Sequence, residues 1–478
     1  MSTNRTDQTM ARNRDVLLTC RNSQGMGIRS TPVRLTRFDV VFEVYNPFSI
    51  LQLSEVLNDF RITIGERLVY SGRATVSNLV NAGIMLLCEA TLNDAWLDVD
   101  LFSPVSQRER LAGELEAFLH EANKARLIEP EFKVVVADMQ TWLADLRRWL
   151  EQLELGIRSI PAGDRATHER EVIEQLHRPV VGETTELFTR FERIANNLPT
   201  EALPMHRTYM RRQLHPLVLC APFPYRTYHK PLGYAGDYEM VNMILGDPLQ
   251  GASLFAKTVN LWFLNQAPSV AHRNRITYLL ENLVAETRRV AAQGRRARIL
   301  NLGCGPAGEV QRFLRDHEVS SEADFLLWDF NPETLDYART QLEGARARHG
   351  RRTELRFEQK SVHQLLRDAG RPMPDTPRYD LVYCAGLFDY LSDRICQRLV
   401  NILYGFVAPG GLLIATNVDP SNPMRHGMEF LLEWHLIYRD QAQMRQLHPT
   451  GVAPACIATK SDDTGVNIYL EVRKPAGG

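Results

Sequence analysis

The sequence lacks a long hydrophobic run. Its longest apolar stretches, such as residues 82–88, have the length of a β-strand, and no run of about 18 uncharged apolar residues occurs. The first 13 residues are polar and lack the apolar core of a secretion signal. These absences predict a protein without an integral membrane segment.

An excess of charge of one sign is also missing. The chain has 56 Lys and Arg against 57 Asp and Glu, a formal net charge of -1. Because a basic surface is the usual footprint of nucleic-acid or anionic-membrane binding, the composition argues against both partners. The seven cysteines are scattered and form no C-x-x-C pair, which indicates free thiols in a reducing cytoplasm.

The remaining composition is that of a globular protein, with 44% hydrophobic and 24% charged residues. A length of 478 residues predicts about three domains. The pattern predicts a small β-barrel at 14–104, a helical region at 105–292 and an α/β domain at 293–475.

The N-terminal region reads as all-β, with strands expected at 14–20, 33–45, 66–70 and 72–78. Residues 72–89 resemble the second half of a PilZ domain, a small barrel that in some members binds cyclic di-GMP. The binding pattern D/N-x-S-x-x-G is broken, because Val80 stands where the serine belongs, and no R-x-x-x-R precedes it. We therefore expect a degenerate barrel that binds no nucleotide, with a nucleotide-binding barrel as the alternative.

The middle region carries apolar residues three and four positions apart among dense charges, as amphipathic helices do. Helices are expected at 108–124, 132–155 and 169–197. A long helical pair could form a stalk or a homodimer surface. A bundle that links the two other domains is the alternative.

The most informative stretch is 296–309, where an apolar strand at 298–302 runs into a turn with Gly303, Gly305 and Gly308. A helix is expected from about residue 309. Such glycines let the backbone approach a nucleotide-like ligand closely. The next strand, at 324–330, ends near Asp329, whose carboxylate can accept hydrogen bonds from both hydroxyls of a ribose. The turn and the carboxylate together predict a cofactor site.

The glycine spacing alone would also fit a dinucleotide enzyme or a turn in an unrelated α/β domain. The stretch L-G-C-G-P-A-G at 302–308 and the motif D-F-N-P-E at 329–333 resemble the first two motifs of class I S-adenosylmethionine methyltransferases. The resemblance implies S-adenosylmethionine as the cofactor, and Pro332 is a favoured first residue of the helix that follows. The cofactor contacts expected in these motifs are Gly303, Cys304, Gly305, Pro306, Gly308, Asp329, Phe330 and Asn331.

Further strands are expected at 354–358, 379–386 and 411–417, followed by an antiparallel pair at 456–460 and 466–472. Helical stretches separate most of them. All seven strands make the Rossmann-like sheet of class I methyltransferases, in which the ligand lies outside the C-terminal strand ends. Further cofactor contacts are therefore expected at Ser361, Val362, Cys384, Ala385 and Gly386.

Residues 222–242 crowd aromatic residues, prolines and glycines into a segment that is a poor helix and a good binding loop. The segment lies where class I methyltransferases place the chain that covers the cofactor, with Tyr234, Gly236 and Asp237 as the expected contacts. An ordinary aromatic-rich connection is the alternative. In the following helix, Arg273 or Arg275 could reach a substrate carboxylate, unless both lie on a solvated basic face.

The N-terminal domain, the helical middle, the stretch K-P-L-G-Y-A-G-D-Y-E-M at 230–240 and the glycine motif together resemble one bacterial family. Its members are the extracellular-factor, or 3-hydroxypalmitic acid methyl ester, biosynthesis methyltransferases. The resemblance covers most of the chain. It implies methyl esterification of a 3-hydroxy fatty acid to give a diffusible quorum-sensing signal.

A carboxylate is already ionised at neutral pH, so its methylation requires positioning rather than a catalytic base. A hydroxyl or a cation must orient the acceptor, and an apolar wall must hold an acyl chain. A helix expected at 428–439 offers both, although it could also only pack on the sheet. The expected catalytic residues are Tyr390, Tyr438 and Arg439, and the expected substrate contacts are Tyr383, Phe388, Trp434 and Arg273; no metal ligands are expected.

Two functional classes stay open. The first is a small-molecule methyltransferase, which the intact glycine motif and Asp329 favour. The second is a signalling adaptor, in which the barrel and the helices bind a partner while the methyltransferase fold is regulatory or idle. Methylation of protein or nucleic acid is a weaker candidate, because A-G-L-F-D at 385–389 replaces an N-P-P-Y-type motif.

Overall fold

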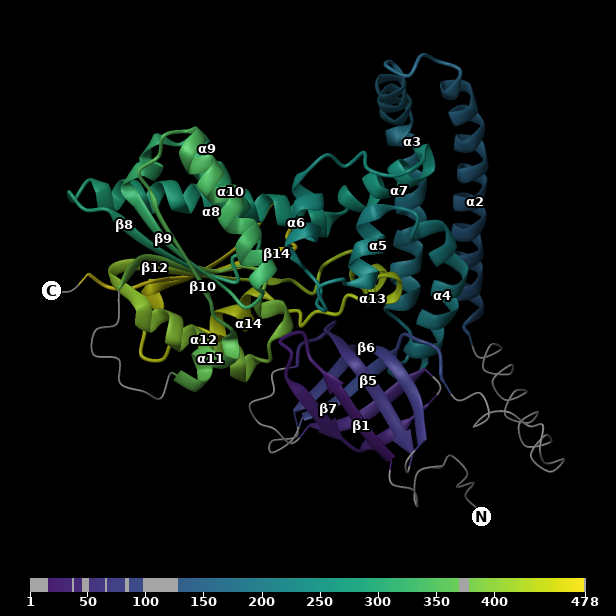
Figure 1. Cartoon of the computed structure of the whole chain (residues 1–478), viewed down its shortest axis with the longest axis horizontal. Helices are drawn as coiled ribbons and strands as arrows, with labels where there is room; N and C mark the ends of the chain where they lie inside the picture. The colour runs from purple at the N-terminus through teal and green to yellow at the C-terminus, as the bar shows by residue number, and fades with distance from the viewer. Residues whose placement is uncertain are drawn as a thin grey trace. The chain divides into compact units, whose positions relative to one another are not determined.

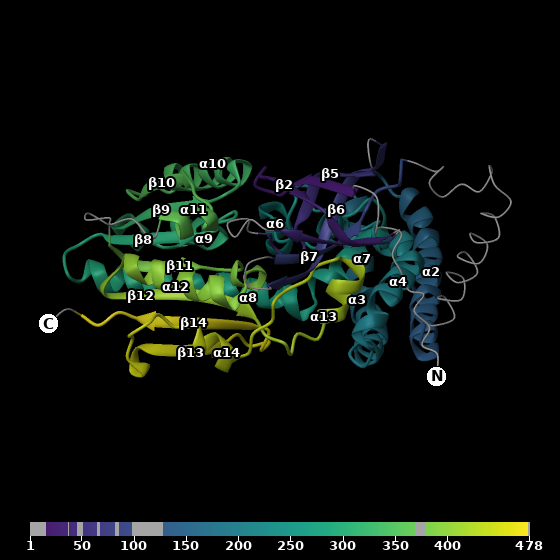
Figure 2. The same ribbon diagram turned by 90° about the horizontal axis from the view of Figure 1, so that it is seen from below.

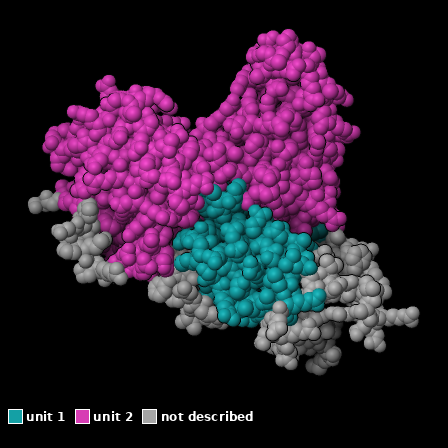
Figure 3. Space-filling model, viewed as in Figure 1, with its two compact units in different colours: residues 1–129, 230–235, 433–435 teal, residues 130–229, 236–432, 436–478 magenta. Residues whose placement is uncertain are grey.

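The computed structural model describes residues 16–36, 38–44, 51–64, 67–81, 86–97, 128–368 and 378–476. The chain forms two compact units (Figure 3). The first unit comprises residues 1–129, 230–235 and 433–435, and the second comprises 130–229, 236–432 and 436–478. The N-terminal unit thus includes two short segments from much later in the chain.

Seven antiparallel strands form one curled sheet in the N-terminal unit, in the order β2-β1-β5-β6-β7-β4-β3 (Figure 1). The strands are β1 (Val16–Arg21), β2 (Gly27–Ser30), β3 (Pro32–Leu35), β4 (Asp39–Val44), β5 (Val56–Ile64), β6 (Arg67–Asn81) and β7 (Leu86–Leu92). Side chains such as Leu18, Phe42 and Phe60 are fully buried and form its core. Among the described residues no pairing joins the edge strands β2 and β3. The sheet is therefore a half-barrel and not the closed barrel expected from the sequence.

Two features of this sheet differ from the expected strands. Strand β6 runs unbroken through residue 71, where the sequence predicts a break between strands at 66–70 and 72–78. Gly72 leaves room for the side chain of Asp94, because a Cβ on Gly72 would lie 2.6 Å from Asp94 Cβ. Strand β5 is not predicted because its polar pair, Asn58 and Asp59, resembles a turn. The pair lies at a register shift between Leu57 and Phe60, and Asp59 has a φ of 47°.

The two later segments of the N-terminal unit bind the start of β5. Val56 N donates to Gly233 O at 2.6 Å. Two residues earlier, Ser54 Oγ accepts a hydrogen bond from His435 N at 2.5 Å and donates to His435 O at 3.2 Å. Segment 230–235 is therefore fixed to the half-barrel by a backbone hydrogen bond, and segment 433–435 by bonds between its backbone and the Ser54 hydroxyl.

The second unit begins with helices. They are α2 (Pro130–Arg158), α3 (Arg165–Ala195), η3 (Thr200–Ala202), α4 (Leu203–Val218), α5 (Pro222–His229), α6 (Tyr238–Leu245), α7 (Leu254–Leu264) and α8 (Ala267–Ala291). Helices α2 and α3 match two expected helices and lie side by side as a long hairpin (Figure 1). Phe132, Phe191 and Phe430 stack edge to face or tilted in its core. The third helix, expected at 108–124, lies outside the described residues.

The aromatic segment at 222–242 is more helical than expected. Its ends form α5 and α6, and only the residues between them are a loop. Pro222 suits the first turn of α5, where its missing N–H costs no hydrogen bond. Asp237 caps α6, because its Oδ1 accepts a hydrogen bond from Met240 N at 2.8 Å. The content of prolines and aromatic residues therefore does not predict these two short helices.

Seven strands form the C-terminal sheet in the order β10-β9-β8-β11-β12-β14-β13, with only β14 antiparallel to β12 and β13 antiparallel to β14 (Figure 2). The strands are β8 (Ala297–Leu302), β9 (Ala323–Asp329), β10 (Glu354–Gln359), β11 (Tyr379–Cys384), β12 (Val407–Val418), β13 (Ile457–Ser461) and β14 (Asn467–Arg473). The apolar runs predicted these strands, and their order is the one that the resemblance to class I methyltransferases implies.

Helices cover both faces of this sheet. One face carries α8, α9 (Gly308–Asp316) and α10 (Pro332–Arg348), and the other carries α11 (Val362–Asp368), α12 (Asp393–Phe406) and α14 (Gln441–Gln446) (Figure 1). Short turns η4 (Glu318–Glu322), η5 (Phe388–Tyr390) and η6 (Pro454–Cys456) lie between elements. Ile299, Phe325 and Leu381 are buried in the core between sheet and helices.

The helix expected at 428–439 is wrong in its extent. Helix α13 covers Arg425–Leu431 and ends there. Glu433 has a φ of 48°, a left-handed conformation that stops a helix, and residues 433–440 are not helical. In the described part of the chain, no helix combines the length and the apolarity that a membrane crossing requires.

Candidate functional site

The C-terminal ends of three parallel strands lie at one level of the sheet (Figure 2). Strand pairing aligns Leu302 of β8 with Trp328 of β9 and Cys384 of β11. The residues that come next along each strand are Gly303, Asp329 and Ala385. The glycine turn, the predicted ribose carboxylate and the segment after the fourth strand thus emerge at one edge, where parallel sheets bind ligands.

The glycine turn needs its glycines. Gly303 and Gly305 have φ values of 69° and 52°, which disfavour a side chain. Gly303 N and Cys304 N both donate to Trp328 O, at 2.8 and 3.1 Å, and hold the turn against β9. A Cβ on Gly308, the first residue of α9, would lie 2.8 Å from Leu245 Cδ1 of α6. The third glycine therefore allows close helix packing rather than an unusual φ.

Two other residues of this turn that are predicted to contact the cofactor have a structural environment of their own. Cys304 is buried, and burial raises the pKa of its thiol well above the usual value, so it stays neutral. The carbonyl of Pro306 accepts a hydrogen bond from Gln311 Nε2 at 2.7 Å. Cofactor contacts of both residues stay predictions.

Asp329 connects the turn to the second motif. Its Oδ2 accepts a hydrogen bond from Gly305 N at 3.2 Å, and its Oδ1 accepts one from Asn331 N at 3.0 Å. The residue is only 6% exposed, and burial raises the pKa of its carboxyl to about 6. Asp329 is therefore an anchored carboxylate that is ionised near neutral pH.

The residues around Asp329 are fixed by helix caps. Asn331 Oδ1 accepts hydrogen bonds from Glu333 N and Thr334 N, and α10 begins at Pro332 as predicted. The carbonyl of Phe330 accepts from Gln359 Nε2 at 2.9 Å. On the neighbouring strand β10, Gln359 pairs with Asp329. The expected adenine contacts, Ser361 and Val362, therefore follow β10 close to the end of β9.

A buried polar cluster lies beside the glycine turn. Glu309, at the start of α9, accepts hydrogen bonds from Tyr383 Oη at 2.7 Å and from Asn301 Nδ2 at 3.2 Å. Burial raises the pKa of the Glu309 carboxyl, and the Tyr383 hydroxyl bond opposes that rise. Tyr383 is 1% exposed, so its hydroxyl serves this cluster. Its predicted contact with a substrate would require a rearrangement.

Beyond Cys384, the chain turns at Gly386, which has a φ of 82° and donates from its N to Thr416 Oγ1 at 3.0 Å. Turn η5 follows and contains Phe388 and Tyr390, two predicted acceptor-side residues. Asp389 between them is buried, and its Oδ1 accepts from Val418 N at 2.6 Å. The crevice edge after β11 is thus a rigid turn.

Arg439 fixes this turn. It is 2% exposed, and Nη1 donates to Phe388 O at 2.9 Å and to Asn417 Oδ1 at 2.7 Å. Nη2 donates to Leu391 O at 2.6 Å, and Nε to Asp393 Oδ1 at 2.8 Å. Arg439 therefore positions η5, and its predicted role in orienting an acceptor carboxylate stays a prediction.

Tyr438, the other predicted catalytic residue outside η5, is half-buried. The guanidinium of Arg425 lies 4.8 Å from its ring centroid. Burial raises the pKa of the Tyr438 hydroxyl well above its usual value. The phenol is therefore a neutral group at physiological pH and can act only as a hydrogen-bonding group.

The aromatic segment meets the crevice at one point in the second unit. A Cβ on Gly236, whose φ is 77°, would lie 3.1 Å from Tyr390 Oη. The carboxylate of Asp237 caps α6 and pairs with Arg226 Nε at 2.9 Å. Tyr234 and Trp434 belong to the half-barrel unit. Gly236 and Tyr390 are thus brought together, whereas contacts of Tyr234, Asp237 and Trp434 with a ligand stay predictions.

The two arginines of α8 differ. Arg273 Nη1 donates to Leu264 O at 2.8 Å and to Ile244 O at 3.3 Å, so it ties helices together. Arg275 is 8% exposed and lies against Gly386 at the end of β11. The predicted substrate contact at Arg273 stays a prediction, and Arg275 has the better position at the crevice.

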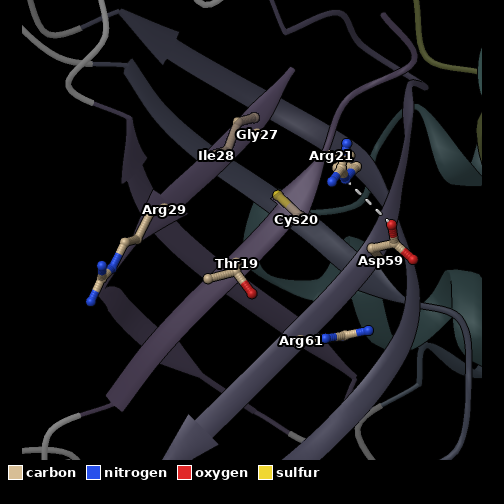
Figure 4. A pocket seen from close by; sticks show the side chains of 8 residues that line it. All are labelled: Thr19, Cys20, Arg21, Gly27, Ile28, Arg29, Asp59 and Arg61. Atoms are coloured by element: carbon tan, nitrogen blue, oxygen red, sulfur yellow. Dashed lines mark ion pairs between the residues drawn. The ribbon is translucent and has the colours of Figure 1, made fainter. Parts of the chain in front are cut away.

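The outer face of the half-barrel has a hollow of about 450 Å³ between β1, β2 and β5 (Figure 4). Thr19 pairs with Arg29 on one side and with Arg61 on the other, and Arg21 lies two residues further along β1. Arg21 pairs with Asp59 at 3.5 Å. The three guanidinium groups lie at separate places around the hollow and do not converge (Figure 4). A bidentate phosphate grip is therefore not formed.

Residues 300–413 match the family model described as a methyltransferase domain. The match spans the glycine turn, Asp329 and the segment after β11. A comparison with curated protein sequences found no match.

Several solved structures resemble the chain. A protein described as a possible exported protein from Bordetella parapertussis is 21% identical, with 53% of this chain and 86% of that chain covered and a TM-score of 0.38. Magnesium protoporphyrin IX methyltransferase from Synechocystis PCC 6803, with bound S-adenosylhomocysteine, is 13% identical (53% and 100% covered, TM-score 0.35). The N-methyltransferase NodS from Bradyrhizobium japonicum WM9 is 14% identical (52% and 99% covered, TM-score 0.31).

These TM-scores are too low to define a shared fold. The C-terminal sheet is identified as a methyltransferase domain by the family match, the strand order and the joined motifs.

Sequence reasoning did not identify Glu309 and Asp389 as members of the site. Glu309 directly follows the last glycine of the turn, in the first turn of a helix that starts at the crevice. That position was a usable signal. Nothing in the sequence signalled the burial of Asp389, since its partner Val418 lies 29 residues away.

Proposed function

We propose that the protein transfers a methyl group from S-adenosylmethionine to the carboxylate of a 3-hydroxy fatty acid or a similar small acid. The observation that carries the proposal is the hydrogen bond between Gly305 N and Asp329 Oδ2 at 3.2 Å. It joins the glycine turn to the predicted ribose carboxylate in the domain that matches the methyltransferase family. The fitting cofactor is a nucleoside whose ribose faces Asp329.

The described residues fit this cofactor. The backbone of Gly303 and Gly305 leaves room for a ligand, because no atom lies within 4 Å of a Cβ placed on either glycine. Asp329 would offer an anchored carboxylate to ribose hydroxyls, and Ser361 and Val362, which follow the neighbouring strand, would contact the adenine. S-adenosylmethionine supplies an electrophilic methyl group on a sulfonium.

The residues on the acceptor side of the site favour a methyl acceptor that reacts without a catalytic base. Apart from Asp329, the buried carboxyls described at the site, Glu309 and Asp389, already accept hydrogen bonds from protein donors. Burial raises the pKa of both. An acceptor that is itself ionised, such as a carboxylate, reacts without either of them. The chain's task is then to position the acceptor, for which Tyr390 beside Gly236 is the proposed contact.

Further parts of the proposal have separate grounds. The resemblances imply a fatty acid methyl ester product that serves as a quorum-sensing signal and a PilZ-like N-terminal unit. The long helical pair of α2 and α3 suggests a homodimer, and the scattered cysteines suggest a cytoplasmic location. All seven cysteines are free, which supports a reducing compartment.

A second candidate is a signalling adaptor with a partner-regulated methyltransferase fold. Segment 230–235, bound to β5 through Gly233, continues along the chain into Gly236 and Asp237 of the predicted cofactor cover. A partner that binds the half-barrel could therefore act on the cover through the chain.

Mass spectrometry of lipid extracts tests the proposal. Cells with the gene should contain fatty acid methyl esters that cells without the gene lack, and a gene with Asp329→Ala should not restore them. Equal methyl ester content in all three strains would contradict the proposed acceptor.

A further inference from the structure

We propose that Arg275 binds a ligand carboxylate in the crevice, either the amino-acid carboxylate of the cofactor or the carboxylate of the acceptor. The proposal rests on the proposed function and adds to it the residue that recognises the anionic group. Neither carboxylate is recognised by the glycine turn or by Asp329, which is itself negative.

Arg275 lies at the ligand end of the sheet. It projects from α8 onto the peptide of Gly386, two residues beyond the end of β11. A Cβ on Gly386 would lie 3.0 Å from Nη2 and 3.1 Å from Nη1 of Arg275. Only glycine at this position allows the guanidinium to pack so closely on the strand end. The charge is therefore placed where the predicted cofactor and acceptor meet.

Arg275 is a buried cation that forms no ion pair with any described residue. It is 8% exposed, and Nε is buried and has no hydrogen-bond partner. Nη2 lies 3.1 Å from a ring nitrogen of His272, and burial lowers the pKa of that imidazole well below its usual value, so His272 is neutral. Across the described ranges no carboxylate forms an ion pair with Arg275. Burying a charge without a partner is strongly unfavourable, so the site favours an added anion.

The carboxylates near Arg275 are hydrogen-bonded to other residues. Burial raises the pKa of Glu309 and of Asp389, and the nearby charge of Arg275 opposes both rises. Yet Glu309 is held by Tyr383 and Asn301, and Asp389 by Val418 N. A guanidinium can bind a carboxylate through two parallel N–H groups. Among the described residues Arg275 Nη2 bonds only His272, and Nε has no partner, so Nε and the second N–H of Nη2 stay available for a carboxylate.

The geometry also explains why Arg273 and Arg439 are weaker candidates. Arg273 donates to two backbone carbonyls, and all three nitrogens of Arg439 donate to η5 and its neighbours. Recruiting either one would leave buried acceptors unsatisfied. Arg275 has an unpartnered Nε and a single side-chain contact, to His272, so binding a ligand leaves no backbone carbonyl without its donor.

Calorimetry on the full chain separates the two carboxylate sources. The probes are S-adenosylhomocysteine, which has the amino-acid end, and 5′-methylthioadenosine, which lacks it. The variants are Arg275→Met, the charge-keeping Arg275→Lys, and Arg288→Met as a control at an exposed position of the same helix. A third titration adds 3-hydroxyhexadecanoate, or its methyl ester, to protein saturated with S-adenosylhomocysteine.

If the cofactor carboxylate is the ligand, Arg275→Met weakens S-adenosylhomocysteine at least about tenfold and leaves 5′-methylthioadenosine unchanged. If the acceptor is the ligand, both nucleosides bind normally and only the free acid loses affinity, whereas the methyl ester does not. Arg275→Lys should keep part of the affinity in either case, and Arg288→Met all of it.

An equal loss for both nucleosides in Arg275→Met and Arg275→Lys would show a structural role and overturn the proposal. So would unchanged binding of every probe. In both outcomes the wild-type protein still binds S-adenosylhomocysteine, and the proposed function stands. A wild-type protein that binds neither nucleoside would instead refute the proposed function itself.

Discussion

Asp329 should make cofactor binding depend on pH. Burial raises the pKa of its carboxyl from 3.8 to about 6 in the ligand-free protein. The carboxylate must be ionised to accept hydrogen bonds from ribose hydroxyls with full strength. Below its pKa the free protein therefore has to release a proton on binding. Each pH unit costs about 1.4 kcal/mol, or about a tenfold loss of affinity.

We expect the affinity for S-adenosylhomocysteine to fall about tenfold between about pH 7 and about pH 5, and to be constant above about pH 7. Asp329→Asn removes both the titrating group and the charge. It should weaken binding at neutral pH by about 2 kcal/mol or more, with no dependence on pH over this range.

Calorimetry in buffers of different ionisation enthalpy measures the affinity and the number of protons released. Asp324→Asn is the matched control, because Asp324 lies at the other end of β9 and pairs with Arg296. Its affinity should follow the wild-type curve. If the affinity of Asp329→Asn for S-adenosylhomocysteine depended on pH as steeply as that of the wild type, Asp329 would not be part of the cofactor site.

Arg439→Ala should destabilise the second unit by about 3 kcal/mol, because it leaves the buried carbonyls of Phe388 and Leu391 without donors; denaturation with urea checks this, and a change near zero would show that η5 holds without it. If the acceptor carries an acyl chain, each added methylene should improve binding by up to about 0.8 kcal/mol until the apolar wall is filled. Calorimetry over a series of 3-hydroxy acids measures this, and affinities independent of length would indicate a small polar acceptor. Cyclic di-GMP should not bind the full chain, since Arg21, Arg29 and Arg61 do not converge; a micromolar dissociation constant would refute that interpretation.

Much of the C-terminal fold could be predicted because central strands such as β8 and β11 are short, apolar and almost wholly buried. The burial of every residue in β11 follows from that pattern. Gly303 and Gly305 marked the turn, since positive φ values are difficult for other residues. The place of Asp329 followed from its position at a strand end. Local sequence was therefore enough to place the elements that carry the predicted cofactor contacts.

The acceptor side could not be predicted in the same way, because its contacts join distant residues. Arg439 looked available for a ligand, yet its donors go to Phe388, Leu391, Asp393 and Asn417, up to 51 residues away. The prediction of a helix at 428–439 was wrong because Glu433 adopts a left-handed conformation, which the local sequence does not predict. Strand β5 was missed because a bulge can hold polar residues that otherwise favour turns.

The most direct test of the central claim follows the methyl group itself. The purified protein is incubated with S-adenosylmethionine that carries an isotopically labelled methyl group and with 3-hydroxyhexadecanoic acid, and the products are analysed by mass spectrometry. We predict a labelled methyl ester of the acid with wild-type protein and none with Asp329→Ala. A protein that binds S-adenosylmethionine but places no label on the carboxylate of this acid, or of any acid in a lipid extract, would contradict the account.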